Sequence, residues 1–276
     1  MVQSIYRYPV KSMLGEMLDR ASVAQGGIVG DRSFALVDEE TQKVVSVKRP
    51  KRWGRMFELA AVGLATDVHV RFPDGTSLSV EDPALGERLS QFFGRRVFVV
   101  STPPAGATFD EVWMRELKND IDPFGMPSRV EDGVEMIDGG QFMSVNGNFF
   151  NFGMVHLVTT STSRRLGVLA PGTRFDPHRF RPNVVVDTSG EGFVENGWPG
   201  KTLTIGTVKL SVSIPVPRCV MTTLAQGDLE ADRAVLRTIT QHNSLDVAGT
   251  PAPCVGVYAD VVAGGDIRIG DPVTVG

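Results

Sequence analysis

A cysteine that directly follows an arginine and two prolines is the feature of this sequence best suited to chemistry. In the stretch IPVPRCVMTT, residues 214–223, Cys219 comes immediately after Arg218. A thiolate is the nucleophilic and metal-binding form of cysteine, and a guanidinium beside a thiol lowers its pKa below the ~8.5 of a free cysteine. Pro215 and Pro217 restrict the backbone that leads to the sulfur. The alternative is a buried structural cysteine on a strand, with Arg218 on the opposite, solvated face.

A second candidate is the stretch RFRPNVVVD, residues 179–187, in which two arginines flank a phenylalanine just before an expected strand. Arginine pairs suit bidentate contact with phosphate or carboxylate groups. The asparagine after the proline, Asn183, can hydrogen-bond to the edge of a heterocycle. Two surface arginines on an ordinary loop are the alternative interpretation.

Two further cations lie in loops at the ends of expected N-terminal strands. Lys11 follows a strand and a proline in YPVKS, and Arg32 follows Gly30, which permits a turn, in GDRSFALVD. Binding residues concentrate on loops of this kind. Taken singly, each cation is more commonly an ordinary surface residue.

The stretch TTSTS, residues 159–163, opens an expected helix. Free N–H groups at a helix start, together with hydroxyls, suit an anion. Simple N-capping is the alternative, and it needs only one of these hydroxyls.

The run KRPKRWGR, residues 48–55, concentrates basic residues around Trp53. Such a run could contact RNA or an acidic partner. In a chain of net negative charge, a solvated loop or the rim of a cofactor site is the favoured interpretation.

Other chemistries lack their motifs in this sequence. There is no glycine-rich phosphate loop that ends in Gly-Lys-Ser/Thr, and no G-x-G-x-x-G at a strand–helix junction. The four histidines include no i, i+4 pair, which argues against a catalytic zinc site. A cysteine hydrolase would need one of them beside Cys219, and sequence spacing cannot show that.

The whole chain reads as an ordinary globular protein. It has 276 residues, of which 42% are hydrophobic and 22% charged, and its net charge of −4 gives no general attraction to nucleic acid or membrane. No secretory signal and no membrane-spanning apolar run is evident. Two cysteines are too few for a disulfide framework. We therefore expect a cytoplasmic, reduced setting.

The elements that must position these residues are mostly short strands. Strands are predicted at residues 4–10, 32–38, 43–47, 68–72, 76–80, 154–160, 183–187, 201–206, 208–214, 219–223, 255–262, 266–270 and 272–276. Helices are predicted at 83–93, with Asp82 as N-cap, Pro83 at the first helical position and Gly94 at the end, and at 161–169 and 230–242. A Pro-Asp-Gly turn at 73–75 predicts a hairpin. The pattern indicates a mainly β fold built from barrels, with a few helices.

Six of these stretches, in this order, resemble the MOSC family, the molybdenum cofactor sulfurase C-terminal superfamily. YPVKS and GDRSFALVD match the N-terminal part, and RFRPNVVVD, FVENGW, PRCVMTT and GDIRIGDPV match the MOSC part. The resemblance is to the branch with an N-terminal β-barrel domain, which includes the amidoxime-reducing component and its bacterial relatives. It implies an N-terminal barrel domain over 1–104 and a MOSC domain over 105–276. Residues 105–152 match nothing and are expected to form an irregular insertion or linker.

The resemblance also implies a cofactor and its ligands. Members of the family bind a pterin-type molybdenum cofactor, and the cysteine after the arginine supplies a thiolate to molybdenum. Cys219 takes that catalytic and metal-binding role here. The residues that fall where the family contacts the pterin or its phosphate are Lys11, Arg32, Thr160, Ser161, Arg181, Asn183 and Arg218.

The function implied is a molybdenum-dependent oxidoreductase that reduces N-hydroxylated or N-oxide substrates. Its electrons would come from a separate flavin or iron–sulfur protein, and no nucleic acid or membrane is expected as a partner. One alternative is a sulfur carrier or cofactor-handling protein with a persulfide on Cys219, because a cysteine flanked by arginine serves both roles. Another is a binding module that recruits a partner through residues 48–55 or the Phe-rich stretch 138–153. Cys254, which lacks a cationic neighbour, is expected to be structural.

Overall fold

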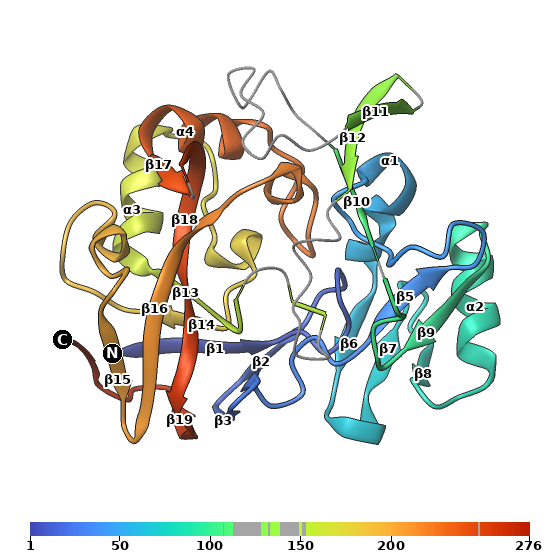
Figure 1. The fold of residues 1–276 in the computed structure, drawn as a ribbon, viewed down its shortest axis with the longest axis horizontal. Helices are drawn as coiled ribbons and strands as arrows, with labels where there is room; N and C mark the ends of the chain where they lie inside the picture. The colour runs from blue at the N-terminus through green and yellow to red at the C-terminus, as the bar shows by residue number, and fades with distance from the viewer. Residues whose placement is uncertain (107, 113–127, 132, 139–148, 151–152, 248) are drawn as a thin grey trace.

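Strands dominate the structure, as the sequence predicts. The computed structural model describes residues 1–276 except 107, 113–127, 132, 139–148, 151–152 and 248. One large sheet with helices α3 and α4 lies on the left of Figure 1, and smaller sheets with α1 and α2 lie on the right. The described helices are α1 (Pro50–Trp53), α2 (Ala84–Phe93), α3 (Thr160–Leu169) and α4 (Ala234–His242). Among the described residues, none of the helices combines the length and the apolar composition that a bilayer crossing requires.

The large sheet joins nine strands. Their order is β2 (Glu16–Leu18), β1 (Val2–Arg7), β14 (Val184–Val186), β13 (Val155–Thr159), β18 (Thr250–Ala263), β16 (Val208–Pro217), β15 (Thr202–Ile205) and β20 (Val273–Val275), with β17 (Ser244–Val247) also paired to β18. Its pairings are antiparallel except between β13 and β14. Val208, Leu210 and Val212 are buried while the residues between them are exposed, the alternation of a strand with one face on the core. The described pairings form a path with two ends, so the expected barrel closure is not seen.

The first strands of the chain pair with strands from its C-terminal part. In β1, Ile5 pairs with Val184 of β14. A second sheet places β3 (Arg20–Ala24) between β4 (Gly27–Ile28) and β19 (Gly265–Arg268). One core cluster joins all of these segments, from Val2 to Ile267. The predicted domain boundary after residue 104 stays a prediction, but residues 1–28 pack with the C-terminal strands.

The right-hand region of Figure 1 contains the remaining N-terminal elements. They are the pair β5 (Ala35–Asp38) and β9 (Val97–Val100), the meander β6 (Ala60–Val62), β7 (His69–Arg71) and β8 (Ser77–Ser79), and helices α1 and α2. The predicted hairpin turn is confirmed, and Gly75 adopts φ +85° within it. Helix α2 ends, as predicted, at Gly94 in the left-handed conformation.

The segment predicted to be irregular contains regular structure where it is described. Strands β10 (Asp110–Val112), β12 (Val134–Asp138) and β11 (Ser128–Glu131) form a three-stranded antiparallel sheet. Most of the Phe-rich stretch 138–153 lies outside the described residues.

Several local predictions were wrong in type or extent. The N-cap of α2 is Pro83 rather than Asp82, although the Asp82 carboxylate accepts from the Ala84 N–H at 2.8 Å. Residues 219–223 were predicted to be a strand, but Val220–Thr223 form a 3-10 helix, η7. The cause is local hydrogen bonding, since the hydroxyl of Thr222 donates to the Cys219 carbonyl at 3.0 Å. Residues 43–47 contribute only a bridge between Val44 and Val37. Helix α4 begins at residue 234 rather than 230.

Candidate functional site

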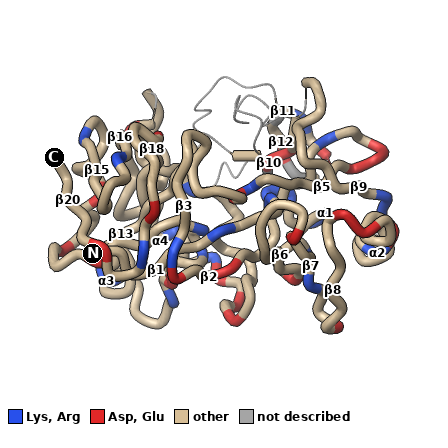
Figure 2. Tube along the Cα trace, turned by 90° about the horizontal axis from the view of Figure 1, so that it is seen from below, with Lys and Arg blue, Asp and Glu red and all other residues tan. Residues whose placement is uncertain are grey.

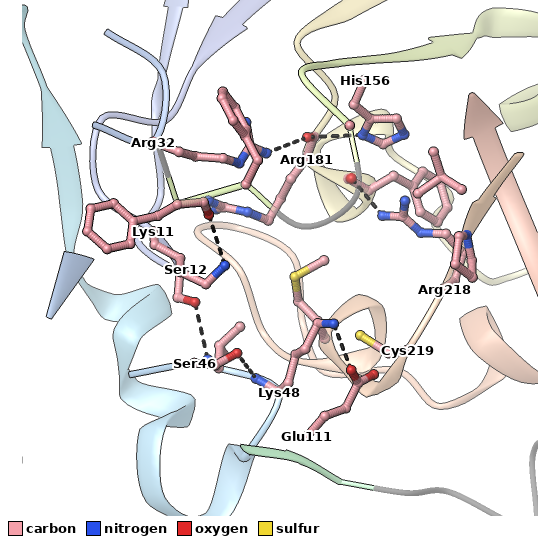
Figure 3. Close-up of a pocket in the computed structure, with 18 of the residues that line it drawn as sticks. Lys11, Ser12, Arg32, Ser46, Lys48, Glu111, His156, Arg181, Arg218 and Cys219 are labelled. Carbon is pink, nitrogen blue, oxygen red and sulfur yellow. Dashed lines mark hydrogen bonds and ion pairs between the residues drawn. The ribbon is translucent and has the colours of Figure 1, made fainter. Parts of the chain in front are cut away.

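A pocket lies where the large sheet meets the N-terminal region. It is open to solvent, with about 1080 Å³ of empty space counted out through its mouth. Its walls come from the loops that follow β1 and β4, the loop before α1, strand β10, the connection between the 3-10 helix η5 (Pro177–Phe180) and β14, and the end of β16. Figure 3 shows side chains from these elements converging on one space.

Six of the eight residues predicted to bind a cofactor line this pocket. They are Lys11, Arg32, Arg181, Asn183, Arg218 and Cys219. They come from positions between 11 and 219 of the chain, so only the tertiary fold brings them together. Thr160 and Ser161 are not among the described lining residues.

Thr160 and Ser161 are instead buried at the start of α3, in a network of hydroxyls and carboxylates. The Thr160 hydroxyl donates to Asp187 Oδ1 at 2.8 Å and accepts from Arg164 Nη1 at 3.0 Å. The Ser161 hydroxyl lies 2.9 Å from that of Thr159, which itself caps the helix. These contacts are those of a capped helix start, so we leave both residues out of the site assembled below.

Strained backbone concentrates at the pocket. Among the described residues, five other than glycine have positive φ, and three of them line the pocket: Ser12 at +67°, Arg32 at +50° and Arg181 at +53°. A left-handed residue with a side chain costs about 1–2 kcal/mol. Such strain persists where the surrounding structure enforces it, and it is common at ligand sites.

Asp31 organises one wall of the pocket and was not singled out in the sequence. Its carboxylate, only 1% exposed, accepts from the Tyr8 backbone N–H at 2.7 Å, from Asn183 Nδ2 at 2.9 Å and from the guanidinium of Arg32. Asn183 in turn accepts from the His156 N–H at 3.1 Å. Its amide therefore ties Asp31 to β13 and supports Arg32. The sequence could have pointed to Asp31, because it directly precedes the predicted site residue Arg32.

The opposite wall ends in the Arg218–Cys219 pair. Pairing between β16 and β18 becomes irregular around Pro215 and Pro217, because proline lacks the N–H that a regular ladder needs. Arg218 is 4% exposed and donates from Nη2 to the Phe180 carbonyl at 2.6 Å, and its buried Nε has no partner among the residues that the structure describes. Cys219 is half-buried, begins η7 and lines the pocket.

Arg179 points away from the pocket although it lies only two residues before Arg181. Its guanidinium donates to the carbonyls of Thr222 and Leu224, at 3.4 and 3.2 Å, and to that of Glu230 at 2.5 Å. It therefore holds the loop that follows Cys219 in place.

The basic run 48–55 folds against the protein rather than standing free as a patch. Lys48 Nζ lies 2.8 Å from Glu111 Oε2 in the pocket, and Arg49 pairs with Asp110 and Glu131 at 3.2 and 2.6 Å. Lys48 and Glu111 are site residues that the sequence did not single out, although the rim of a cofactor site was one interpretation of this run.

Cys254 has the surroundings expected of a structural cysteine. It is fully buried on β18, and its thiol lies 3.2 Å from the Ala252 carbonyl. Burial raises the pKa of the Cys254 thiol to about 12, so it stays protonated at neutral pH.

The pocket is strongly cationic in a protein of net negative charge. Its described lining carries five basic side chains, Lys11, Arg32, Lys48, Arg181 and Arg218, against the single carboxylate of Glu111. Arg181 and Arg218 donate to backbone carbonyls and, among the described residues, pair with no carboxylate. Burial, and then the charge of Arg32, lowers the pKa of Arg181 to about 10. Burial likewise lowers the pKa of Lys11 well below its ordinary value.

Buried guanidinium groups without acidic partners are costly in an isolated protein, and an anionic ligand removes that cost. Arginine and lysine donors at this density suit a phosphate or a similar oxyanion. The geometry therefore describes an anion site next to a half-buried cysteine.

Comparison with known proteins agrees with this geometry. A model described as the MOSC N-terminal beta barrel domain matches residues 1–112, and the MOSC domain model matches residues 151–274. The chain belongs to the MOSC family. The pocket draws on both matched segments, with Lys11, Arg32 and Lys48 from the first and Arg181 and Cys219 from the MOSC domain.

Relatives of this MOSC protein include two named amidoxime reducing components. The chain is 34% identical over 101 residues to mitochondrial amidoxime reducing component 2 of Bos taurus, and 34% identical over 99 residues to that of Homo sapiens. These matches cover 35% and 34% of this chain, and 29% of each relative's length.

Among solved structures, the YuaD protein from Bacillus subtilis aligns with a TM-score of 0.45 at 12% identity, covering 99% of this chain and 93% of that one. YiiM from Geobacillus stearothermophilus aligns with a TM-score of 0.32 at 17% identity, covering 45% and 54%.

Proposed function

We propose that this protein binds a pterin-type molybdenum cofactor in the pocket, with Cys219 as the thiolate ligand of the metal. The observation that carries the proposal is the pair of buried guanidinium groups, Arg181 and Arg218, that lack carboxylate partners among the described residues. The orphaned Nε of Arg218 is a donor that a bound anion would satisfy. Arg32 and Lys11 add further basic side chains to the lining of the pocket.

Each of these residues has a task that its contacts support. Arg181 and Arg32 would bind the phosphate, held in place by Asp31, Asn183 and their strained backbone. The prolines before Cys219 and the Arg179 contacts behind it would keep the sulfur in position.

We further propose that the reaction is reduction of N-hydroxylated or N-oxide substrates. For an N-hydroxyl group, two electrons and two protons break the N–O bond, leave N–H on the product and release one water. The molybdenum cofactor, when bound, supplies the two-electron chemistry, while the protein orients the substrate and excludes water. A separate flavin or iron–sulfur protein would supply the electrons. The similarity to amidoxime reducing components supports this assignment.

The first test is the molybdenum and pterin content per chain of protein expressed in a host that makes the cofactor. We expect near-stoichiometric metal in the wild type and in Cys254→Ser, and loss of metal in Cys219→Ser. Cys254→Ser is the matched control, because Cys254 is buried on β18 and outside the described pocket lining. Reduction of an amidoxime by the loaded wild type, with an artificial electron donor, tests the reaction itself.

Metal-free wild type from a host that loads a control molybdoenzyme would contradict the proposal. Mass spectrometry of Cys219 would then test the sulfur-carrier alternative, for which a mass gain of one sulfur atom on this residue is expected. The half-buried position of Cys219 at the pocket leaves its sulfur accessible for that role.

A further inference from the structure

The pocket has two chemically different ends. Arg32, Arg181 and His156 lie together at one end in Figure 3, and Lys48 and Glu111 lie beside Cys219 at the other. At the first end Arg32 is paired with Asp31, but Arg181 pairs with no carboxylate among the described residues, so a positive charge is left over. The second end holds the Lys48–Glu111 ion pair, which has no net charge. An anionic group is therefore attracted to the first end, and the space beside Cys219 is left for an uncharged polar group.

Lys48 and Glu111 form a largely buried pair in this second end. Lys48 Nζ lies 2.8 Å from Glu111 Oε2, and the two side chains are 12% and 8% exposed. Lys48 Nζ also lies 5.1 Å from the centre of the Phe109 ring, which limits its movement. Burying an ion pair of this kind generally gains no stability over apolar residues of the same volume. Its place in the pocket lining points to a role in binding.

The chemistry of the pair suits a hydrogen bond to a ligand oxygen. An ammonium group carries three N–H donors, and the contact with Glu111 uses one. Cys219 lies beside Lys48 and Glu111 in Figure 3, and all three residues line the same pocket. A ligand group that reaches Cys219 therefore meets an N–H donor of Lys48.

We propose that Lys48 donates a hydrogen bond to the oxygen of the substrate's N–O group, and that Glu111 orients Lys48 for this contact. The inference rests on the proposed reductase function and deepens it. It assigns the substrate as an uncharged N-hydroxyl or N-oxide group that enters beside Cys219. Lys48 is then a catalytic residue that touches the reacting oxygen, and Glu111 is a positioning residue.

The test uses the loaded full-length protein and benzamidoxime, a simple amidoxime, with an artificial electron donor. Lys48→Met should lower kcat/KM roughly 10- to 100-fold, the effect of losing one hydrogen bond from a charged donor. Lys48→Arg keeps a cationic donor and should recover part of the loss. Glu111→Gln should lower kcat/KM by less than Lys48→Met does. The double variant Glu111→Gln, Lys48→Arg should recover part of that loss. Molybdenum per chain should stay at the wild-type level in all variants.

Lys51→Met is the matched control, because Lys51 lies in the same basic run but is exposed and outside the described pocket lining. It should leave kcat/KM unchanged. Wild-type kcat/KM in Lys48→Met would overturn the proposal.

A binding measurement separates this inference from the proposed function. Calorimetric titration of benzamidoxime into the oxidised, loaded protein needs no turnover, and Lys48→Met should weaken binding relative to the wild type and Lys51→Met. If the loaded wild type binds benzamidoxime through Lys48 but does not reduce it, the reductase function fails and the Lys48 contact stands. If it reduces benzamidoxime equally well without Lys48, the function stands and the contact fails. A loaded wild type that neither binds nor reduces benzamidoxime overturns both.

Discussion

Two arginines on either side of Phe180 have opposite tasks in this protein. Arg179 donates to the carbonyls of Thr222, Leu224 and Glu230, so its charge is spread over the backbone it holds. Arg181 donates to the Met13 carbonyl at 2.5 Å, and its guanidinium lies 4.2 Å from the centre of the Tyr8 ring, facing the pocket. The first arrangement holds the backbone in place, and the second leaves a charged donor at the pocket.

A pair of substitutions distinguishes these tasks. Arg179→Met should lower the free energy of unfolding by about 3 kcal/mol, because several buried carbonyls lose a charged donor. Arg181→Met should change the free energy of unfolding of the cofactor-free protein by less than about 1 kcal/mol. The variant loses the contacts of Arg181, but it also removes the cost of burying a charge that has no carboxylate partner, and the two effects oppose each other. Only Arg181→Met should lose the cofactor while remaining fully folded.

Urea unfolding and molybdenum content measure the two effects on the same samples. An Arg181→Met variant that unfolds as easily as Arg179→Met, or that retains full cofactor, would show that Arg181 is structural.

At the scale of elements, strand β10 is held to the N-terminal region by charge on both of its faces. Successive side chains of a strand point to opposite sides, so Asp110 and Glu111 face different neighbours. Asp110 contacts Lys43 and Arg129 at 2.6 and 2.7 Å, while Glu111 faces the pocket and Lys48. The basic run and the strand thus assemble one wall of the site together.

This attachment predicts a pH-dependent stability. Burial opposes ionisation of Asp110, but hydrogen bonds from Lys43 and Arg129 prevail and hold the pKa of its carboxyl below its usual range. A carboxyl whose pKa is lowered on folding stabilises the fold at pH values above its unfolded-state pKa of ~3.9. This stabilisation is lost as the pH falls from that value through the folded-state pKa. Asp110→Asn should therefore cost about 2 kcal/mol at neutral pH and progressively less below about pH 4.

Urea unfolding at several pH values measures the difference between the wild type and the variant. Asp260→Asn, at an exposed position on β18, serves as the control. A difference between the wild type and Asp110→Asn that stays constant down to pH 3 would rule out this role for Asp110.

At the scale of the whole molecule, the two family segments are interlocked. Strand β1 pairs with β14, and β3 pairs with β19, so the start of the chain completes sheets built from its end. The pocket likewise takes residues from both segments. Acidic and basic residues are interspersed along the trace in the view of Figure 2, so the excess of cations is a property of the pocket.

Separating the segments should therefore prevent folding. Residues 151–276 expressed alone would lack β1, which pairs with β14, and β3, which pairs with β19. We expect no cooperative thermal unfolding of this segment by circular dichroism. Co-expression with residues 1–112 should give a complex that melts cooperatively and co-elutes in size-exclusion chromatography. Cooperative melting of residues 151–276 alone, at the temperature of the intact chain, would contradict this account.

The sequence by itself determined the mainly β class, because alternation of apolar and polar residues is a local property, as in residues 208–212. It also determined the hairpin at Gly75 and the end of α2 at Gly94. It pointed as well to the site candidates, which are cations in loops next to strands and a cysteine directly after an arginine: Lys11, Arg32, Arg181 and Cys219.

Only the tertiary structure decided which of these residues meet. Arg179 and Arg181 look alike in the sequence, and their directions depend on the turn between η5 (Pro177–Phe180) and β14, where Arg181 adopts positive φ. Lys48 and Glu111 looked like an ordinary basic run and an unassigned segment until the fold placed them together. The hydroxyls of Thr160 and Ser161 suited an anion in the sequence, but in the structure they bond to Asp187 and to Thr159 at the start of α3. Burial and pairing over long sequence separations are set by the packing of the whole chain, and local patterns do not contain them.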